Sequence, residues 1–549
     1  MGVEREVNGV RVAAVGEVNS EHYDALVLVT APGLVPPQAL EDFVAAARQL
    51  DAELDRTPAL LQCARVSGAR LVLAPTGPLG EYEDVRAVRD AARAGLARAL
   101  AAGARRPALV LQPLPRWPDA PLVALLAALE LLYVYNTQDL PGNVSKRHSP
   151  AQPLQVRETF PELAHKVTAL GVYSEGLQGS VDDLLREAVA LEAGRAAARD
   201  IGGADPERMT PLRTADYVRA LFGAASAVRV RVMDQRAQLE HHYPLLAAVD
   251  RAAASVPRHR GCVIFLEYEP DSYERTVMLV GKVSARECVC VCVCGGVVTR
   301  RAIGPQGVTY DTGGCDIKAG GVMAGMSRDK CGAAAIVGFL KVCDELRPAL
   351  KVVASLGMVR NSVGEEAYVA DELLRSRRGL AVRVGNTDAE GRLVMADLLA
   401  ELAARAAAER APMLYTVATL TGHAARAYGR GYTAVLDSHA ARGHAAAFRA
   451  AAERLGDMVE LSVLRREDLA AHAGRGRDQL HQAESAASVS LPRGHQAPAA
   501  FLLLAAGLEA GDVPYAHLDV AASAGDLPDD PTAAPLLGLA AYYGLVAKR

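Results

Sequence analysis

Three short stretches concentrate glycine and charge in the second half of the chain: residues 307–321 (GVTYDTGGCDIKAGG), 326–339 (MSRDKCGAAAIVGF) and 384–399 (VGNTDAEGRLVMADLL). Together they place four carboxylates among apolar segments: Asp311, Asp329, Asp388 and Glu390. If these acids cluster and are buried, they repel one another and lose hydration, so compensating positive charge is needed. Two divalent cations would supply it, and carboxylate oxygens suit Zn²⁺, Mn²⁺ or Mg²⁺.

Two basic residues accompany these acids. Lys318 and Arg392 would leave the site net positive once cations are bound, which suits an oxyanion. Glu390 and Arg392 stand at the start of a helix predicted from the spacing of later apolar residues, where backbone N–H groups face outward. Taken singly, the third stretch also fits a solvated turn, and Asp329 also fits a helix N-cap.

The segments that must position these residues alternate in type. Short β-like runs at 25–29 and 70–74 and a helical stretch at 84–102 predict an α/β domain with a largely parallel sheet. A long helix predicted at 180–201 could link two domains, and residues 136–153 are predicted to form a surface loop.

The expected fold class is α/β, with a small N-terminal domain and a larger C-terminal domain whose mixed β-sheet is flanked by helices. We place the N-terminal domain at 1–180, the linking helix at 181–204 and the catalytic domain at 205–549. Within the last domain, strands are expected at 276–280, 351–355 and 413–419, and helices at 333–343 and 393–408.

Composition excludes several classes of protein. A chain of 549 residues exceeds one ordinary core, and its net charge of −4 provides no positive field for nucleic acid or an anionic membrane. The most apolar run, 121–135, contains Glu130 and is shorter than the roughly 20 residues that span a bilayer. The charged N-terminus lacks a signal-peptide core. These features predict a cytoplasmic protein whose nine cysteines stay reduced.

The motifs resemble a known family. NTDAEGR at 386–392, followed by LVMADLL, is similar to the signature of the leucyl aminopeptidase family, the two-metal cytosolic aminopeptidases. YDTGG with the later Ile-Lys at 310–318, and M-x-x-D with GAAA at 326–335, resemble that family too. Further landmarks, such as ATLTG at 418–422 and AHLDVA at 516–521, follow in the same order. The similarity covers about residue 195 to the end of the chain.

The resemblance implies a role for each matching residue. Two divalent ions, Zn²⁺ or Mn²⁺, would be bound by Lys282, Asp311, Asp329, Asp388 and Glu390. Lys318 would stabilise a tetrahedral intermediate, and Arg392 would hold a bicarbonate ion that shuttles protons. Thr419 and Leu420 would line the substrate pocket. The implied activity is removal of N-terminal residues from peptides that have a free N-terminus, by a homohexamer. The alternative is a catalytically impaired relative with a structural or interaction role.

One segment departs from the family pattern. The family's ligand lysine lies five residues before the aspartate, whereas Lys282 lies 29 residues before Asp311. Removal of the 24 extra residues, 283–306, restores VGKGVTYDTGG without a gap. The extra segment contains ECVCVCVCGG at 287–296. The strand could end with Lys282 in place and loop the segment out, or it could re-form with Gln306 five residues before Asp311.

The insert itself admits three interpretations. Val-Ser can be encoded by GTGAGT, a typical intron start, Cys-Val repeats by a TG tract, and Gln306 by CAG, a typical intron end. We therefore hypothesise that residues 283–306 are a retained or mis-annotated in-frame intron. As a strand, the insert would have its cysteines on one face, where thiolates could bind a soft metal. It could also be a plain apolar surface strand prone to edge pairing.

Overall fold

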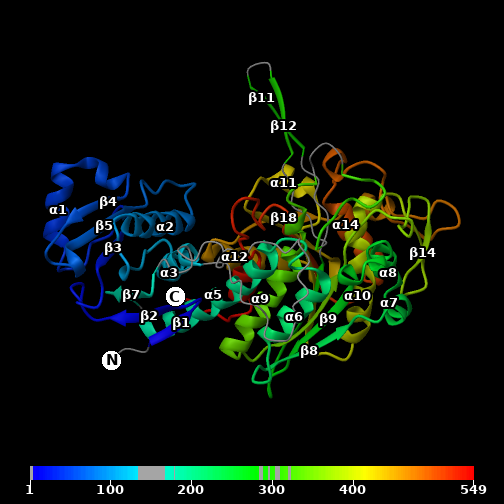
Figure 1. Ribbon diagram of the computed structural model, residues 1–549, viewed down its shortest axis with the longest axis horizontal. Coiled ribbons are helices and arrows are strands. Elements are labelled where there is room, and N and C mark those ends of the chain that lie inside the picture. The colour runs from blue at the N-terminus through cyan, green and yellow to red at the C-terminus, as the bar shows by residue number, and fades with distance from the viewer. Residues whose placement is uncertain are drawn as a thin grey trace.

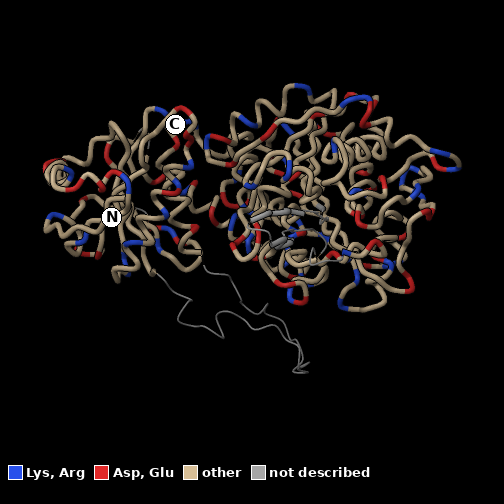
Figure 2. The backbone as a smooth tube through the Cα atoms, turned by 90° about the horizontal axis from the view of Figure 1, so that it is seen from above, with Lys and Arg blue, Asp and Glu red and all other residues tan. Residues whose placement is uncertain are grey.

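The computed structural model describes residues 4–133, 167–177, 180–282, 289–294, 297–302, 309–318 and 323–549. Two large sheets organise this part of the chain, one of seven strands and one of eight (Figure 1). The loop expected at 136–153 lies outside the described residues. Figure 2 shows basic and acidic residues interleaved along the described backbone, as expected from the small net charge.

The seven-stranded sheet is built by the N-terminal part of the chain, with strand order β1-β2-β7-β6-β3-β5-β4. Its strands are β1 (Glu4–Val7), β2 (Val10–Val15), β3 (Ala25–Thr30), β4 (Ala59–Gln62), β5 (Arg70–Pro75), β6 (Pro107–Leu111) and β7 (Ala169–Ser174). The inner pairs are parallel and the two outermost pairs are antiparallel. The helices here are α1 (Glu41–Leu50), α2 (Arg86–Ala101) and α3 (Ala120–Leu132). The predicted strands β3 and β5 and the predicted helix α2 are confirmed.

The eight-stranded sheet is mixed, as expected, with strand order β18-β17-β20-β16-β10-β13-β9-β8. Its strands are β8 (Val228–Met233), β9 (Cys262–Tyr268), β10 (Thr276–Lys282), β13 (Lys351–Met358), β16 (Pro412–Ala418), β17 (Tyr432–Asp437), β18 (Met458–Val463) and β20 (Tyr515–Asp519). The central strand β10 runs parallel to both β13 and β16. A smaller sheet joins β14 (Leu373–Arg375), β15 (Ala381–Arg383) and β19 (Leu480–His481).

Helices cover both faces of the eight-stranded sheet. Along β10, Val277 and Leu279 pack into one hydrophobic cluster with α9 (Cys331–Leu346), and Met278 and Val280 pack into another with α10 (Glu390–Ala406). A central strand that is apolar on both faces is typical of a parallel sheet buried between helical layers. The other helices of this part are α6 (Pro211–Leu221), α7 (Arg236–His242), α8 (Pro244–Asp250), α11 (Gly422–Tyr428), α12 (His444–Ala452), α13 (Arg466–Ala470), α14 (Gln496–Ala506) and α15 (Leu536–Tyr542).

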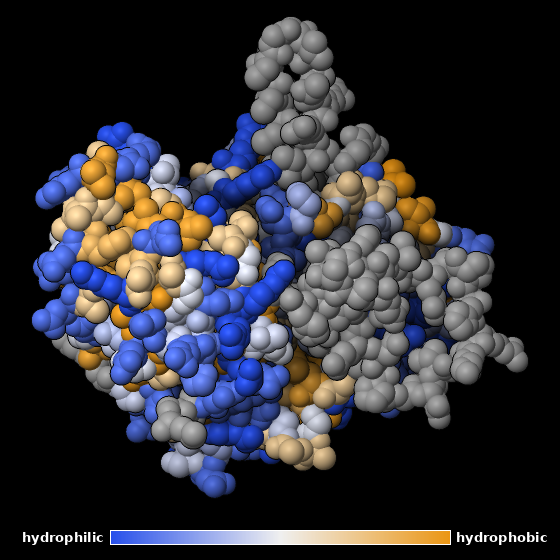
Figure 3. Space-filling model, turned by 60° about the vertical axis from the view of Figure 1, so that its left-hand side comes forward, coloured by the Kyte–Doolittle hydropathy of each residue, from blue (hydrophilic) through white to orange (hydrophobic). Residues whose placement is uncertain are grey.

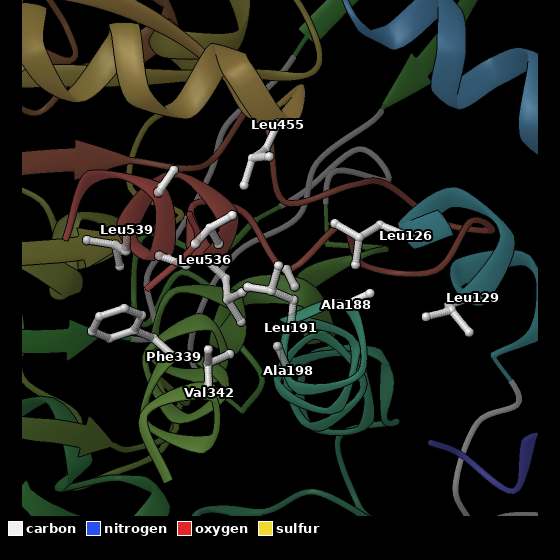
Figure 4. Packing of buried hydrophobic residues seen from close by; sticks show 14 of the residues in the cluster. Leu126, Leu129, Ala188, Leu191, Ala198, Phe339, Val342, Leu455, Leu536 and Leu539 are labelled. Atoms are coloured by element: carbon white, nitrogen blue, oxygen red, sulfur yellow. The ribbon is translucent and has the colours of Figure 1, made fainter. Parts of the chain in front are cut away.

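A long helix, α5 (Val181–Gly203), packs against elements of both halves of the chain. Its apolar residues, among them Leu191 and Ala198, meet α3 on one side and α9 and α15 on the other (Figure 4). A buried ionic cluster also joins α5 to α3. In it Glu192 is 2.6 Å from Arg199 and 3.1 Å from Arg195, and Glu130 of α3 accepts from Arg195.

The insert after Lys282 is described in part. β11 (Val289–Cys294) and β12 (Val297–Ala302) pair antiparallel in a two-stranded sheet of their own. This ribbon projects from the body of the molecule (Figure 1).

The outer surface is mixed in character. Figure 3 shows hydrophilic and hydrophobic residues interspersed over the face that carries the N-terminal elements. In the described part of the chain, every helix is too short or too polar to cross a bilayer.

Candidate metal centre

Three of the four predicted acids converge at one edge of the eight-stranded sheet. Asp311 forms a bridge with Asn361, which follows β13, while Asp329 lies in the short 3-10 helix η6 (Met326–Lys330) just before α9. Glu390 is the first residue of α10. One carboxylate oxygen from each acid lies within 4.8 Å of the other two, and all three side chains are buried. Ligands at the carboxyl ends of parallel strands are the expected arrangement in α/β folds.

Asp388, the fourth acid, is linked to this cluster by Lys318. Lys318 Nζ is 3.1 Å from Asp311 Oδ2 and also pairs with Asp388. Burial by itself lowers the pKa of Lys318, but Asp311, Asp388 and Glu390 outweigh it and raise that pKa above its usual value. One ammonium cannot balance four neighbouring carboxylates in a buried site. The excess negative charge and the all-oxygen acid set fit divalent cations.

Glycines allow the chain to approach this closely. Gly313 and Gly314 have φ of +85° and +60°, in the left-handed region that disfavours side chains. A Cβ on Gly313 would lie 2.6 Å from Asp316 O, and one on Gly314 would lie 2.9 Å from Asn361 Oδ1. Without side chains at these two positions, the chain can turn tightly next to the acids.

Asn361 was not predicted as part of the site. Its Nδ2 donates to Asp311 Oδ1 at 2.8 Å, to the Thr387 carbonyl at 3.0 Å and to Glu390 Oε2 at 3.4 Å. Tyr368 was missed too, and its hydroxyl donates to the same Thr387 carbonyl at 2.7 Å. Neither residue lies in a charged motif. For Asn361, the available signal was its place three residues after β13, the strand that runs parallel to β10.

Thr419 and Leu420, expected beside the substrate, take different positions. Thr419 is buried, and its hydroxyl donates to Asp329 Oδ1 at 2.9 Å. Leu420 lines a pocket, and its backbone N–H donates to Asp519 Oδ1 at 3.1 Å. The structure therefore places Thr419 against an acid of the cluster and Leu420 at the pocket wall.

Arg392 lines the same pocket from the first turn of α10, together with Asn386, Asp388, His472 and Glu484. Its Nη1 donates to the Gln482 carbonyl at 3.0 Å. Burial lowers the pKa of Arg392 to about 10, against the opposing effect of Glu390. The guanidinium remains charged at neutral pH, so an anion could bind in this pocket.

Lys282 is the last residue of β10, where its backbone pairs with Gly357 of β13. The insert ribbon lies outside the eight-stranded sheet. β10 therefore ends at Lys282, and the insert strands pair outside the eight-stranded sheet. Gln306, the other candidate for this position, lies outside the described residues.

Lys330, the residue after Asp329, is a buried cation that is held by backbone carbonyl groups. Its side chain is fully buried, and Nζ donates to the carbonyl oxygens of Ala204, at 2.8 Å, and Ser327. Lys330 therefore ties the turn that carries Asp329 to the residue after α5.

Known proteins resemble this chain in sequence and in fold. The catalytic-domain profile of the cytosol aminopeptidase family matches residues 196–284 and 300–537, and so omits most of the insert. A Caenorhabditis elegans protein named as an aminopeptidase is 38% identical over 493 residues, which are 88% of this chain and 85% of that protein. A Chlamydia muridarum protein named as a cytosol aminopeptidase is 29% identical over 66% of this chain and 64% of its own length.

Two solved structures show the same fold over nearly the whole chain. The bottromycin maturation enzyme BotP, in complex with Mn, matches with a TM-score of 0.71 and 22% identity, over 95% of this chain and 98% of its own. A tomato leucine aminopeptidase mutant matches with a TM-score of 0.72 and 17% identity, over 99% of this chain and 98% of its own.

Proposed function

Because the chain belongs to the cytosol aminopeptidase family, we propose that it is a metal-dependent exopeptidase that removes N-terminal amino acids from peptides. One observation carries this proposal. Asp311, Asp329 and Glu390 come from three separate motifs, yet their carboxylate oxygens meet within 4.8 Å in a buried site. Such a concentration of buried negative charge has no structural benefit without cations to balance it.

The proposed ligands are Asp311, Asp329, Asp388, Glu390 and Lys282, which would hold two divalent ions, Zn²⁺ or Mn²⁺. When bound, such ions polarise a peptide carbonyl, lower the pKa of a water molecule towards about 7 and can hold the free α-amine of the substrate. Asn361 keeps Asp311 and Glu390 in fixed orientations through its Nδ2. Thr419 does the same for Asp329.

Two basic side chains, Lys318 and Arg392, would complete the proposed chemistry. Lys318 is buried among the acids, where its ammonium could donate to the oxygen that becomes negative as the carbonyl is attacked. Arg392 faces the pocket and could hold a bicarbonate ion that accepts a proton from the attacking water. Leu420 at the pocket wall would contact the substrate, and Thr419 would act through Asp329.

We also propose where the protein acts, how it assembles and how its chain is divided into domains. The protein would act in the cytoplasm as a homohexamer, on peptide substrates. The N-terminal domain would comprise residues 1–180, the linking helix 181–204 and the catalytic domain 205–549. Residues 283–306 would be an intron-derived segment, and sequencing of the spliced transcript tests this. A dominant message that contains the Cys-Val codons would refute it.

The proposed activity is tested by metal content and hydrolysis of leucyl-amide substrates. Two divalent ions per chain and loss of hydrolysis with a chelator are expected. Asp329→Asn should lower kcat by about 100-fold or more. Asp344→Asn is a matched control, because Asp344 lies on α9, away from the acid cluster, where it accepts from the Ala227 N–H at 2.8 Å. A wild-type protein that assembles without metal and hydrolyses no leucyl amide would instead be the catalytically impaired relative.

A further inference from the structure

Gln482 makes an unusual set of hydrogen bonds to the loop that carries Asp388. This side chain is fully buried and directly follows β19. Its Oε1 accepts from the N–H groups of Gly385, at 2.9 Å, and Asn386, at 3.0 Å. Its Nε2 donates to the carbonyl oxygens of Asn386 and Ala389, both at 2.8 Å. One amide thus satisfies four backbone groups of a five-residue loop.

These bonds matter because the loop, 385–389, is partly buried and its regular structure is limited to the short 3-10 turn Thr387–Ala389. It connects β15 to α10 beyond the point where the β15–β19 pairing ends at Arg383 and His481. Buried backbone groups need partners, and a glutamine amide offers two acceptor and two donor positions. Gln482 uses all four and so continues the pairing after the strands have ended.

Two further contacts connect the segment 482–483 to the loop and to Arg392. The backbone carbonyl of Gln482 accepts from Arg392 Nη1 at 3.0 Å. The next residue closes the space behind the loop, since a Cβ on Gly385 would lie 1.8 Å from Ala483 O. The loop backbone and this segment therefore pack closely at Gly385, where a side chain would clash.

We propose that Gln482 is a positioning residue that sets the placement of Asp388, Glu390 and Arg392 relative to one another. This inference rests on the proposed function to the extent that these residues act on a metal-bound substrate. Glutamate at this position would keep the acceptor oxygen but lose both donors. Asparagine would keep the amide, but its side chain is one methylene shorter and so reaches about 1.5 Å less far. It therefore cannot hydrogen-bond to all four backbone groups of the loop.

The test compares Gln482→Glu, Gln482→Asn and the control Gln479→Glu. Gln479 also contacts the small sheet, but its Oε1 only accepts from the Ala381 N–H, at 3.0 Å, which glutamate can still do. Three quantities are measured: Mn²⁺ affinity by calorimetry after chelator treatment, kcat and KM on a leucyl amide, and amide hydrogen exchange of residues 385–389 in the metal-free protein.

Both Gln482 variants should bind Mn²⁺ about 10–100-fold more weakly and lose more in kcat than they change in KM. Their loop amides should exchange faster while the strands of the eight-stranded sheet keep wild-type exchange, and Gln479→Glu should match the wild type in all three measurements. Wild-type Mn²⁺ affinity and loop exchange in folded Gln482→Asn would overturn the inference. If the wild type binds no Mn²⁺, the proposed function fails, and the exchange comparison still decides whether Gln482 holds the loop.

Discussion

The hydroxyl of Thr419 donates a hydrogen bond to Asp329 Oδ1 over 2.9 Å, and both side chains are fully buried. Thr419 follows β16, whereas Asp329 precedes α9, so this bond joins the two elements that pack beside β10. Loss of such a hydrogen-bond donor leaves the buried carboxylate unsatisfied, which costs folding free energy. It also frees the carboxylate to rotate away from the orientation that a metal ion requires.

Thr419→Val should therefore weaken metal binding by about 10-fold or more, because valine has the same shape but no hydroxyl. Calorimetric titration with Mn²⁺ measures the change. Thr433→Val is the matched control, since Thr433 is equally buried but bonds to Ser523 Oγ, at 2.7 Å, in another part of the sheet. Equal Mn²⁺ affinities for the two variants would contradict a role of Thr419 in orienting Asp329.

Low pH should reduce the free energy of unfolding, in part through protonation of His444. The ring contacts the hydroxyls of Tyr415, at 3.1 Å, and Tyr542, at 3.0 Å, and burial lowers its pKa to about 4. In the unfolded chain the pKa is about 6.5, so between pH 6.5 and pH 4 the unfolded state binds more protons. The contribution of His444 to stability is complete above pH 6.5 and is lost as the pH falls.

His444→Gln should thus reduce the difference in unfolding free energy between pH 7 and pH 5 by about 2 kcal/mol. Urea denaturation at the two pH values measures this difference. His22→Gln, at an exposed position, should leave it unchanged. The same pH dependence in the His444 variant and the wild type would rule out this histidine as a source of acid lability.

The ionic cluster between α3 and α5 should contribute to stability. Glu130 lies 3.6 Å from Arg199, and although burial raises its pKa, Arg195 and Arg199 lower that pKa to about 2. Glu130→Gln leaves Glu192 as the acid that pairs with the two buried arginines, among the residues that the structure describes. The expected loss is up to about 3 kcal/mol of unfolding free energy, below the usual range for a buried pair because Glu130 is 25% exposed.

Urea denaturation at pH 7 checks the loss from Glu130→Gln. Because the low pKa favours the ionised form, this stabilisation should persist as the pH falls from 7 to 5. Glu53→Gln removes an exposed pair with Arg56, at 3.8 Å, and should change stability by less than about 0.5 kcal/mol. Equal losses for the two variants would show that the buried cluster adds nothing.

Deletion of residues 283–306 should leave the eight-stranded sheet intact. The described strands of this segment pair only with each other in the described part of the chain, and β10 already includes Lys282. The deletion variant should therefore keep the melting temperature within about 2 °C and hold two divalent ions per chain. Thermal unfolding and metal analysis check these values. Loss of metal on deletion would mean that the insert supports the centre.

Much of the fold could be predicted because it depends on local pattern. Apolar runs such as 25–29 and 351–355 became the buried strands β3 and β13, and the helix expected at 180–201 became α5. The sequence also predicted that three acids, Asp311, Asp329 and Glu390, lie near one another. Buried charges are costly unless positive charge compensates them, and one group of cations could compensate all three. Their convergence appears in the structure.

The supporting residues could not be predicted, because their partners are distant in sequence. Asn361 and Gln482 are neutral, lie outside the motifs and act through backbone or side-chain groups tens of residues away. The burial of Lys330 could not be predicted either, because a lysine is usually exposed. Its compensation, the Ala204 carbonyl, depends on where α5 ends in space.

The bond from Lys330 to Ala204 has a mechanical consequence. The 23 residues of α5 form a stiff rod about 34 Å long, seated on β1 and β2 at one end and on η6 at the other. Because this one helix contacts both, a displacement of the N-terminal sheet would also shift the turn that presents Asp329.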